Sequence, residues 1–332
     1  MNWSPLRTLL LPLAWSYGAG MRVRAWFYRR GIFCARRLNG IVISVGNLTL
    51  GGTGKTPLVA WLAAGLADAG NRVGILMRGY RGRGGTSDEA ELLRERLGDR
   101  ALLGIGANRY RKGRELARGG VNCFVLDDGF QHLALARDVD IVLIDALDPF
   151  GAGLLPVGRR REPKAALRRA DVVVITRSEH APAIEAVVRR FTDAPIFYAR
   201  TELEKVVPSP LSAVEAGAAD WFGRRVFAFC GIGNPQAFFE DVRRWGMELV
   251  GGMAFRDHHR YTPRDAQRIE QAALAAGAEA LITTEKDIYN LREVYFTRLP
   301  VYFCRIALRI AEAEKFWEVL DAIVEMKRSR PQ

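Results

Sequence analysis

Acidic residues are missing from the start of this 332-residue chain, in which no aspartate or glutamate precedes Asp68. The first 67 residues hold eight lysines and arginines, so they carry +8 of the net charge of +12, and the other 265 residues carry +4. Such a concentration of positive charge indicates nucleic acid, an anionic membrane surface or a phosphorylated ligand as a partner. Because 49% of the residues are apolar, the chain can bury the cores of about two domains, which excludes a disordered chain.

Cysteine is scarce. The four cysteines, Cys34, Cys123, Cys230 and Cys304, lie far apart, and each stands in an apolar run. This pattern excludes a disulfide scaffold and offers no zinc-ligand spacing, and it fits reduced thiols in a cytosolic protein.

Long uncharged runs are also absent. Residues 8–21 carry no charge, but they include Pro12 and two glycines and fall short of the roughly 20 apolar residues of a membrane-spanning helix. The arginines follow this stretch instead of preceding it, so the segment does not fit a signal peptide, and no export is predicted.

The N-terminal segment, residues 1–40, has the pattern of a helix that lies on a membrane surface. Leu6, Leu9, Leu10, Leu13 and Tyr17 recur at helical spacing. Six arginines alternate with aromatic residues over residues 22–37, and together they could contribute at most about 6 kcal/mol at an anionic leaflet. The alternative is a helix packed on the core with a solvated basic face.

After Gly40, short β-branched runs alternate with helix-like stretches, which is the pattern of a parallel sheet flanked by helices. The runs are 41–45, 73–77, 121–126, 139–144 and 172–176. The alternation lapses over residues 201–225 and then resumes, which indicates a linker near residue 205. We predict an α/β fold with a first domain at 41–205 and a smaller α/β domain at 206–332.

The most informative segment is a predicted strand, 41–45, followed by a glycine-rich turn and the start of a helix. The turn consists of Thr49, Leu50, Gly51, Gly52, Thr53, Gly54, Lys55 and Thr56. Its glycines let backbone N–H groups converge on phosphate oxygens, Lys55 offers a cation to the terminal phosphates, and the Thr56 hydroxyl can reach Mg²⁺. Thr49 replaces the usual first glycine, but Gly51 and Gly52 can provide the turn. We predict binding of a nucleoside triphosphate, with a purely structural turn as the alternative.

Two carboxylates, Asp127 and Asp128, end the apolar run 123–126. At the carboxyl edge of a parallel strand beside a phosphate loop, they are placed to hold Mg²⁺. One can bind the ion while the other orients the nucleophile or Lys55, and the residues leave these roles open. The alternative is a pair of loop-capping aspartates.

The ordered motifs of the chain resemble those of the tetraacyldisaccharide 4'-kinases, the lipid A 4'-kinases of Gram-negative envelope biosynthesis. They are GNLT at 46–49, GGTGKTP at 51–57, RGY at 78–80, DDGFQH at 127–132, LLP at 154–156, REP at 161–163, GIGNP at 231–235, FRDHH at 255–259 and TTEKD at 283–287. The resemblance spans residues 1 to about 320. It implies a P-loop kinase fold with a membrane-associated N-terminal helix, and transfer of the γ-phosphoryl group of ATP, with Mg²⁺, to the 4'-hydroxyl of a lipid-linked disaccharide 1-phosphate.

The resemblance also implies catalytic residues besides Lys55 and Asp128. Asp88 matches the acidic motif of the family and His258 its histidine in the second domain, so we expect Asp88 to act as the base, oriented by His258. Such a pair would bring both domains to one cleft. Without the resemblance, Asp88 would more often cap a helix. Ser87 and Ala90 replace the usual glycine and proline around the acidic pair, which alters the loop and not the aspartate itself.

Further site residues are expected on the same basis. Glu162 is a candidate third carboxylate of the Mg²⁺ shell, or else a glutamate favoured at a helix start. Arg78 and Arg109 could face the 1-phosphate of the substrate, because a planar guanidinium suits phosphate. Gln131 and His132 follow the paired aspartates closely enough to touch the same site, and they are further candidates for contact with the substrate.

A second hypothesis is a membrane-associated P-loop ATPase that acts as a nucleotide-dependent switch or positioning factor. Such a switch has no need of the motifs at 161–163 and 255–259, which the kinases have. Nucleic-acid binding fits the charge but lacks a reader module. We therefore expect a lipid substrate and an anionic membrane surface as partners, no nucleic acid, no obligate protein partner, and a location on the cytoplasmic face of the bacterial inner membrane.

Overall fold

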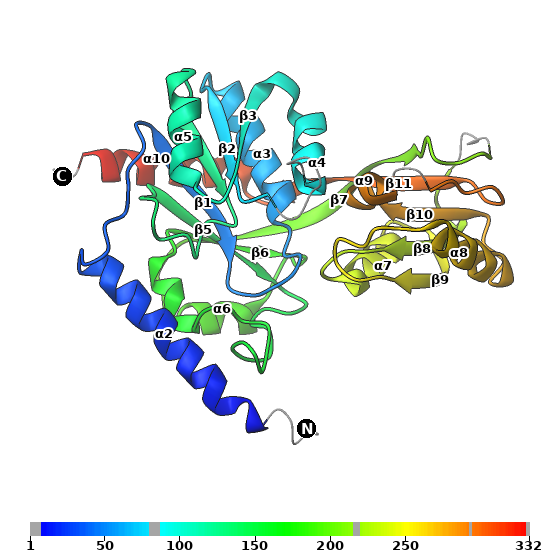
Figure 1. Ribbon diagram of the computed structural model, residues 1–332, viewed down its shortest axis with the longest axis horizontal. Helices are drawn as coiled ribbons and strands as arrows, with labels where there is room; N and C mark the ends of the chain where they lie inside the picture. The colour runs from blue at the N-terminus through cyan, green and yellow to red at the C-terminus, as the bar shows by residue number, and fades with distance from the viewer. Residues whose placement is uncertain (1–7, 80–86, 215–219, 292–293, 330–332) are drawn as a thin grey trace. The chain divides into compact units, whose positions relative to one another are not determined.

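The structure, a computed structural model, describes residues 8–79, 87–214, 220–291 and 294–329 (Figure 1). They divide into two compact units. The first unit contains residues 8–79, 93–200 and 308–329, and the second contains 87–92, 201–214, 220–291 and 294–307. This division differs from the expected domains 41–205 and 206–332, because 308–329 return to the first unit and 87–92 belong to the second.

A parallel sheet forms the centre of the first unit, with the strand order β3-β2-β4-β1-β5-β6-β7. The strands are β1 (Ile41–Asn47), β2 (Val73–Met77), β3 (Ala101–Ile105), β4 (Cys123–Asp127), β5 (Val139–Asp145), β6 (Val172–Thr176) and β7 (Ile196–Pro208). Every residue of β2, β4, β5 and β6 is buried. A sheet covered on both faces needs apolar residues on both, which explains why these strands are continuous apolar runs in the sequence.

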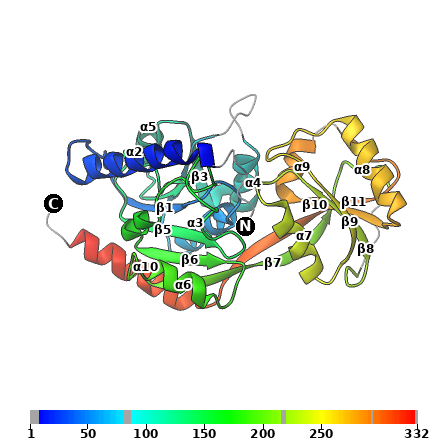
Figure 2. The same ribbon diagram turned by 90° about the horizontal axis from the view of Figure 1, so that it is seen from below.

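Helices cover this sheet. They are α2 (Leu11–Arg29), α3 (Lys55–Asp68), α4 (Asp88–Leu97), α5 (Arg109–Arg118), α6 (Pro182–Val188) and α10 (Ala313–Arg328), with 3₁₀ turns η1 (Gly98–Arg100) and η2 (Lys164–Arg169). Figure 2 shows α2 and α5 on one side of the sheet and α10 on the other. Of α4, only residues 93–97 belong to the first unit.

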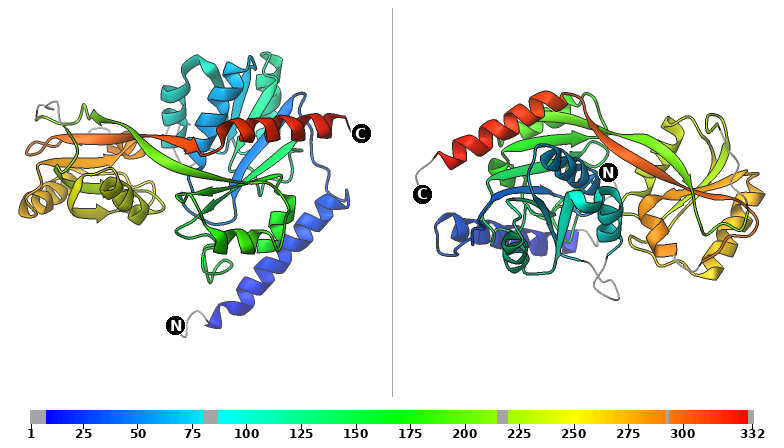
Figure 3. Two further views of the ribbon diagram at one scale, coloured as in Figure 1. Left: turned by 180° about the vertical axis from the view of Figure 1, so that it is seen from behind. Right: turned by 90° about the horizontal axis from the view of Figure 1, so that it is seen from above.

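The return of the C-terminal helix to the first unit has a packing cause. Phe316 of α10 is fully buried against Phe197 of β7, with ring centroids 5.1 Å apart. Trp317 stacks on Trp61 of α3 at 4.9 Å. A Cβ on Gly65 would lie 2.4 Å from the Trp317 ring, so α3 needs a glycine where the two helices meet. Figure 3 shows α10 lying along the sheet.

Helix α2 buries little of its own surface. Ala14 and Gly18 are buried, whereas Leu13 is 58% exposed and Trp15 is 74% exposed. In the part of the chain that the structure describes, no helix is long and apolar enough to cross a membrane. Leu6 lies outside the described residues, and membrane association of the segment stays a prediction.

The second unit is a smaller α/β unit with the strand order β11-β10-β8-β9, in which β11 pairs with β10, β10 with β8 and β8 with β9, all parallel. Its elements are β8 (Arg225–Cys230), α7 (Pro235–Arg244), β9 (Glu248–Ala254), α8 (Pro263–Ala275), β10 (Ala280–Thr284), α9 (Glu285–Leu291) and β11 (Val301–Ile310). Its core includes Phe229, Phe296 and Ile269, which are fully buried. The chain passes between the units within α4, β7 and β11.

Candidate active site

The phosphate loop joins β1 to α3, as the sequence predicts. Gly51 and Gly54 have φ angles of +112° and +82°, a region in which residues with a side chain are strained. Gly54 is the N-cap of α3, so Lys55 and Thr56 are the first residues of the helix. A glycine-rich loop that leads into a helix start is the setting in which backbone N–H groups and the positive end of a helix bind phosphate.

The ammonium of Lys55 lies beside two oxygen groups at the carboxyl edge of the sheet. Its Nζ is 3.2 Å from Asn47 Oδ1 and 3.7 Å from Asp128 Oδ1. The structure thus brings together Lys55 and Asp128, two of the predicted catalytic residues.

Asp128 has an arginine partner that the sequence did not predict. Arg161 donates from Nη1 and Nη2 to the two carboxylate oxygens, each at 2.7 Å, and it also hydrogen-bonds Asn47. Burial acts to raise the pKa of Asp128, but the hydrogen bonds from Arg161 and the charge of Lys55 outweigh it and hold the pKa well below its usual range. Asp128 therefore keeps its negative charge and fixes both cations.

The other two predicted carboxylates differ in their surroundings. Asp127 ends β4 opposite Val45 of β1, next to the loop, and is 7% exposed. Glu162 is 2% exposed, and Arg169 holds both of its oxygens at 2.9 Å. Arg169 also lies over the ring of Phe130, 4.3 Å from its centroid. Glu162 is therefore engaged in a buried ion pair.

The predicted substrate residues share a positive environment in the first unit. Arg78 follows β2 and is exposed, Arg109 is buried at the start of α5, and Gln131 Nε2 donates to the carbonyl oxygen of Asn47 at 3.0 Å. Burial lowers the pKa of His132 to about 4, helped by the charges of Arg109 and further arginines, Arg78 included. His132 is thus neutral near pH 7. Tyr80 of the RGY motif lies outside the described residues.

Helix α2 contacts the same edge of the sheet. The Tyr17 hydroxyl donates to the carbonyl oxygen of Arg161 at 2.9 Å, and Arg24 donates to that of Gln131 at 3.0 Å. The charge of Arg24 also acts on His132. Only the basic, aromatic composition of α2 pointed to a function in the sequence, and it did not indicate a place beside the phosphate loop.

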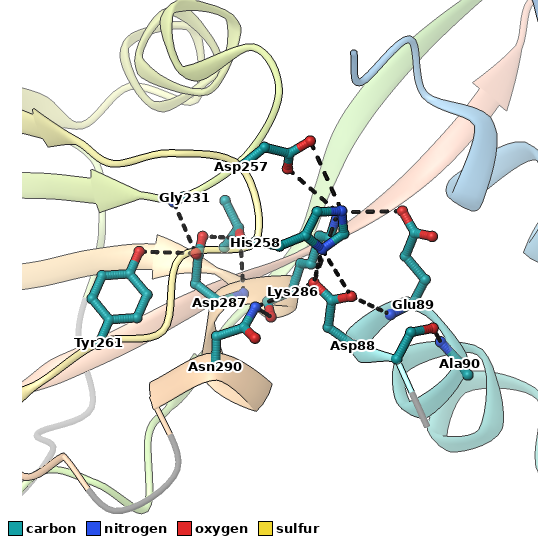
Figure 4. Close-up of polar contacts among 12 residues, drawn as sticks. Asp88, Glu89, Ala90, Gly231, Asp257, His258, Tyr261, Lys286, Asp287 and Asn290 are labelled. Atoms are coloured by element: carbon teal, nitrogen blue, oxygen red, sulfur yellow. Dashed lines mark hydrogen bonds and ion pairs between the residues drawn. The ribbon is translucent and has the colours of Figure 1, made fainter. Parts of the chain in front are cut away.

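In the second unit, Asp88 and His258 form the predicted pair (Figure 4). His258 Nδ1 lies 2.9 Å and 3.1 Å from the two oxygens of Asp88. Asn290 Nδ2 donates to Asp88 at 3.2 Å, and the backbone N–H of Glu89 does so at 3.0 Å. The Asp88 side chain is 5% exposed and that of His258 is 36% exposed.

The two members shift each other's pKa toward the charged forms. Burial acts to raise the pKa of Asp88, but the hydrogen bond from His258 and the charge of Lys286 lower it overall. The hydrogen bond with Asp88 raises the pKa of His258, against burial and the charge of Lys286. Asp88 is therefore ionised near pH 7, the form from which a base must start.

Lys286 stands beside this pair and was not among the predicted site residues. Its Nζ is 3.5 Å from His258 Nε2 and 3.2 Å from Glu89 Oε1 (Figure 4). The TTEKD motif contained it, but nothing in that motif indicated a partner almost 200 residues away.

No group of three or more His, Cys, Asp or Glu side chains is arranged to hold a metal ion within residues 8–79, 87–214, 220–291 and 294–329.

Comparison with known proteins agrees with this geometry. A family model described as tetraacyldisaccharide-1-P 4'-kinase matches residues 6–325, which include the second-half motifs on which the kinase and switch hypotheses differ. Tetraacyldisaccharide 4'-kinase of Koribacter versatilis is 36% identical over 96% of this chain and 99% of its own length. That of Geobacter metallireducens is 38% identical over 95% and 98%. The structure of LpxK from Aquifex aeolicus in complex with ATP superposes with a TM-score of 0.71, at 30% identity, over 96% of this chain and 99% of that one.

Proposed function

The chain belongs to the tetraacyldisaccharide-1-P 4'-kinase family, and on that premise we propose how its own residues perform the reaction. The family acts in lipid A biosynthesis and phosphorylates the 4'-hydroxyl of a tetraacyl disaccharide 1-phosphate. The observation that carries our assignment is the phosphate loop, in which Lys55 opens α3 with its ammonium 3.7 Å from Asp128.

Residues 49–56 would hold the triphosphate of ATP. The N–H groups around Gly51 and Gly54 surround its oxygens, and Lys55 neutralises the γ-phosphate. Thr53 Oγ1 is buried without a hydrogen-bond partner among the described residues, which leaves it as a donor for a phosphate oxygen. Asp128, held by Arg161, orients Lys55 toward the transferred group.

Thr56 and Asp127 fit an Mg²⁺ ion whose other ligands are phosphate oxygens. Both lie at the carboxyl edge of the sheet next to the loop, and hydroxyl and carboxylate oxygens are the donors this ion prefers. When bound, it would neutralise charge on the transferred phosphoryl group. Glu162 would have to release Arg169 before it could join them.

The Asp88–His258 pair would remove the proton of the 4'-hydroxyl. Asp88 is the base, and His258 orients it and stabilises its charge through Nδ1. A positioned base of this kind contributes about 10²- to 10⁴-fold to the rate.

Arg78, Arg109, Gln131 and His132 would bind the anionic end of the substrate. Burial is the main cause of the low pKa of His132, and the charges of Arg109 and further arginines add to it; the same charges attract a phosphate. A neutral imidazole and an amide can add hydrogen bonds without adding charge.

We further propose that α2 lies on the cytoplasmic face of the inner membrane. Its exposed Leu13, Trp15 and Trp26 can enter the interface while its arginines meet lipid phosphates. The contacts of Tyr17 and Arg24 with the active-site edge would then hold that edge near the lipid substrate.

The test is a labelling assay with γ-labelled ATP, Mg²⁺ and a tetraacyl disaccharide 1-phosphate in detergent. We expect label on the lipid, and we expect Asp88→Ala to lower kcat by at least about 10²-fold with the KM for ATP little changed. ATP consumption without labelled lipid would exclude the kinase activity. Near-normal turnover of Asp88→Ala would exclude Asp88 as the base.

A further inference from the structure

The first turn of α9 lies against the Asp88–His258 pair, and the proposed mechanism gives it no role. Its residue Lys286 lies next to the side chains of Asp88 and His258, and its residue Asp287 lies next to the backbone near His258. We propose that Lys286 and Asp287 are positioning residues for the pair. Lys286 keeps the Asp88 carboxylate and the His258 imidazole in their mutual orientation, and Asp287 holds the backbone from which His258 projects. This inference rests on the proposed role of the pair as the base.

Lys286 is a largely buried cation surrounded by carboxylates. Its Nζ lies 3.2 Å from Glu89, 3.7 Å from Asp257 and 3.8 Å from Asp88, and its side chain is 19% exposed. Burial acts to lower the pKa of Lys286, but the charges of these three carboxylates outweigh it, and the pKa is raised. The ammonium is therefore a permanent positive charge beside the pair.

The position of that charge determines how His258 carries its proton. Nδ1 faces Asp88, and Nε2 faces the Lys286 ammonium at 3.5 Å. An ammonium has only donors, so this approach is favourable when Nε2 keeps its lone pair. Together the two contacts favour a proton on Nδ1 toward Asp88 over a proton on Nε2. Lys286 opposes the rise in the pKa of His258 that Asp88 and Asp257 cause, and Asp257 Oδ2 lies 3.9 Å from Nε2.

Asp287 acts on the backbone side and is completely buried. It accepts hydrogen bonds from the N–H of Gly231 at 2.8 Å, the Tyr261 hydroxyl at 2.9 Å and Thr284 Oγ1 at 2.5 Å. The carbonyl oxygen of Gly231 in turn accepts the N–H of His258 at 2.9 Å. Asp287 is thus connected to the His258 backbone through hydrogen bonds to one residue, Gly231.

That backbone needs support. His258 has φ of +58°, in the left-handed region that residues other than glycine seldom adopt. The loop before it packs tightly on Gly231, where a Cβ would lie 3.0 Å from the Arg256 carbonyl oxygen. Without Asp287 fixing Gly231, we expect His258 to relax and Nδ1 to leave Asp88.

The test compares Lys286→Met, Lys286→Arg and Asp287→Asn in the full-length enzyme, with Lys315→Met as the control. The Lys315 side chain is 64% exposed and pairs with Glu312 on the surface. We expect Lys286→Met and Asp287→Asn to lower kcat roughly 10- to 100-fold, with the KM for ATP within about twofold of wild type. Lys286→Arg, which keeps the charge, should recover most of the loss, and Lys315→Met should change nothing.

Two readouts separate positioning from a merely structural role. The acidic limb of the kcat–pH profile should move to higher pH in Lys286→Met, because Asp88 loses a neighbouring positive charge. When Asp88 is already replaced by asparagine, adding Lys286→Met should lower kcat further by less than about twofold. An unchanged profile, or an equal loss in both backgrounds, would overturn the inference. Wild-type turnover of Asp88→Asn would instead overturn the proposed base.

The ¹⁵N NMR chemical shifts of the His258 ring provide a measurement that does not depend on turnover and can be made on inactive variants. At a pH above the pKa of the ring, the wild-type protein should show the Nδ1–H tautomer, and Lys286→Gln should protonate the ring at a higher pH than wild type. The Nε2–H tautomer in the wild-type protein would contradict the contact with Lys286.

Discussion

Replacement of Arg169 by methionine tests what the buried Glu162 carboxylate does. Glu162 has a side chain 3% exposed, and Arg169 holds both of its oxygens at 2.9 Å. Removing one partner of a buried ion pair typically costs about 3–5 kcal/mol, since it leaves a charge without compensation. Arg161 also acts on Glu162, and methionine can still pack on the Phe130 ring. We therefore place the cost of Arg169→Met at about 2–4 kcal/mol.

The double variant Glu162→Gln/Arg169→Met removes both charges, and we expect it to recover at least about 1 kcal/mol of that loss. Urea unfolding followed by tryptophan fluorescence measures both. With a slope near 3 kcal/mol per molar urea, Arg169→Met should lower the midpoint by roughly 1 M. A control, Arg168→Met, changes the neighbouring arginine of the same 3₁₀ turn and should leave the midpoint within about 0.2 M.

The Mg²⁺ dependence of Glu162→Gln completes this test. If Glu162 serves the ion pair, the Mg²⁺ concentration for half-maximal turnover should stay within about twofold of wild type. The reasoning is refuted if Arg169→Met unfolds at the wild-type midpoint. It is also refuted if Glu162→Gln needs about tenfold more Mg²⁺, which would make the carboxylate a ligand of the ion.

Three further predictions follow from the site and its supports. Lys55→Met should lower kcat at least about 10²-fold with an unchanged urea midpoint, and retention of more than half the turnover would remove Lys55 from phosphate binding. Because His132 has a low pKa in the folded protein, its contribution to the free energy of unfolding is lost as the pH falls from about 6.5 toward about 4. The urea midpoint of His132→Asn should therefore fall less over that pH range than the midpoint of wild type. An equal pH dependence of the two midpoints would contradict this prediction. Gly46→Ala should unfold at a lower urea concentration than wild type, because its Cβ would lie 2.7 Å from the Phe130 backbone nitrogen. The control Gly20→Ala in α2, where a Cβ would meet no atom within 4 Å, should be as stable as wild type or more stable by up to about 1 kcal/mol.

Sequence patterns located the sheet because its strands obey a local rule. The runs predicted at 73–77 and 172–176 have the same bounds as β2 and β6, since a strand buried on both faces shows itself as an unbroken apolar run. The phosphate loop was also local, with strand, glycines, Lys55 and helix in one continuous stretch. Membership of the kinase family, predicted from the ordered motifs, is confirmed by the family match over residues 6–325.

What escaped prediction depends on partners far apart in the chain. Arg161 pairs with Asp128 across 33 residues, and Lys286 meets Glu89 across 197. Both stand in motifs of the family, REP and TTEKD, but nothing local indicates which residues they pair with. The return of residues 308–329 to the first unit depends on Trp61 and Trp317 meeting, which no periodicity in either segment reveals.

The position of α10 has a consequence for synthesis of the chain. Residues 201–307, most of the second unit, are translated after the first-unit part of β7 and before the helix that covers Trp61 and Phe197. A nascent chain therefore emerges from the ribosome with an apolar face of its nucleotide-binding half uncovered for over 100 residues of elongation. At about 5–20 residues per second, that exposure lasts several seconds, long enough for a chaperone to engage. Packing of the face that contains Trp61 and Phe197 is thus complete only after residues 313–328 have been made.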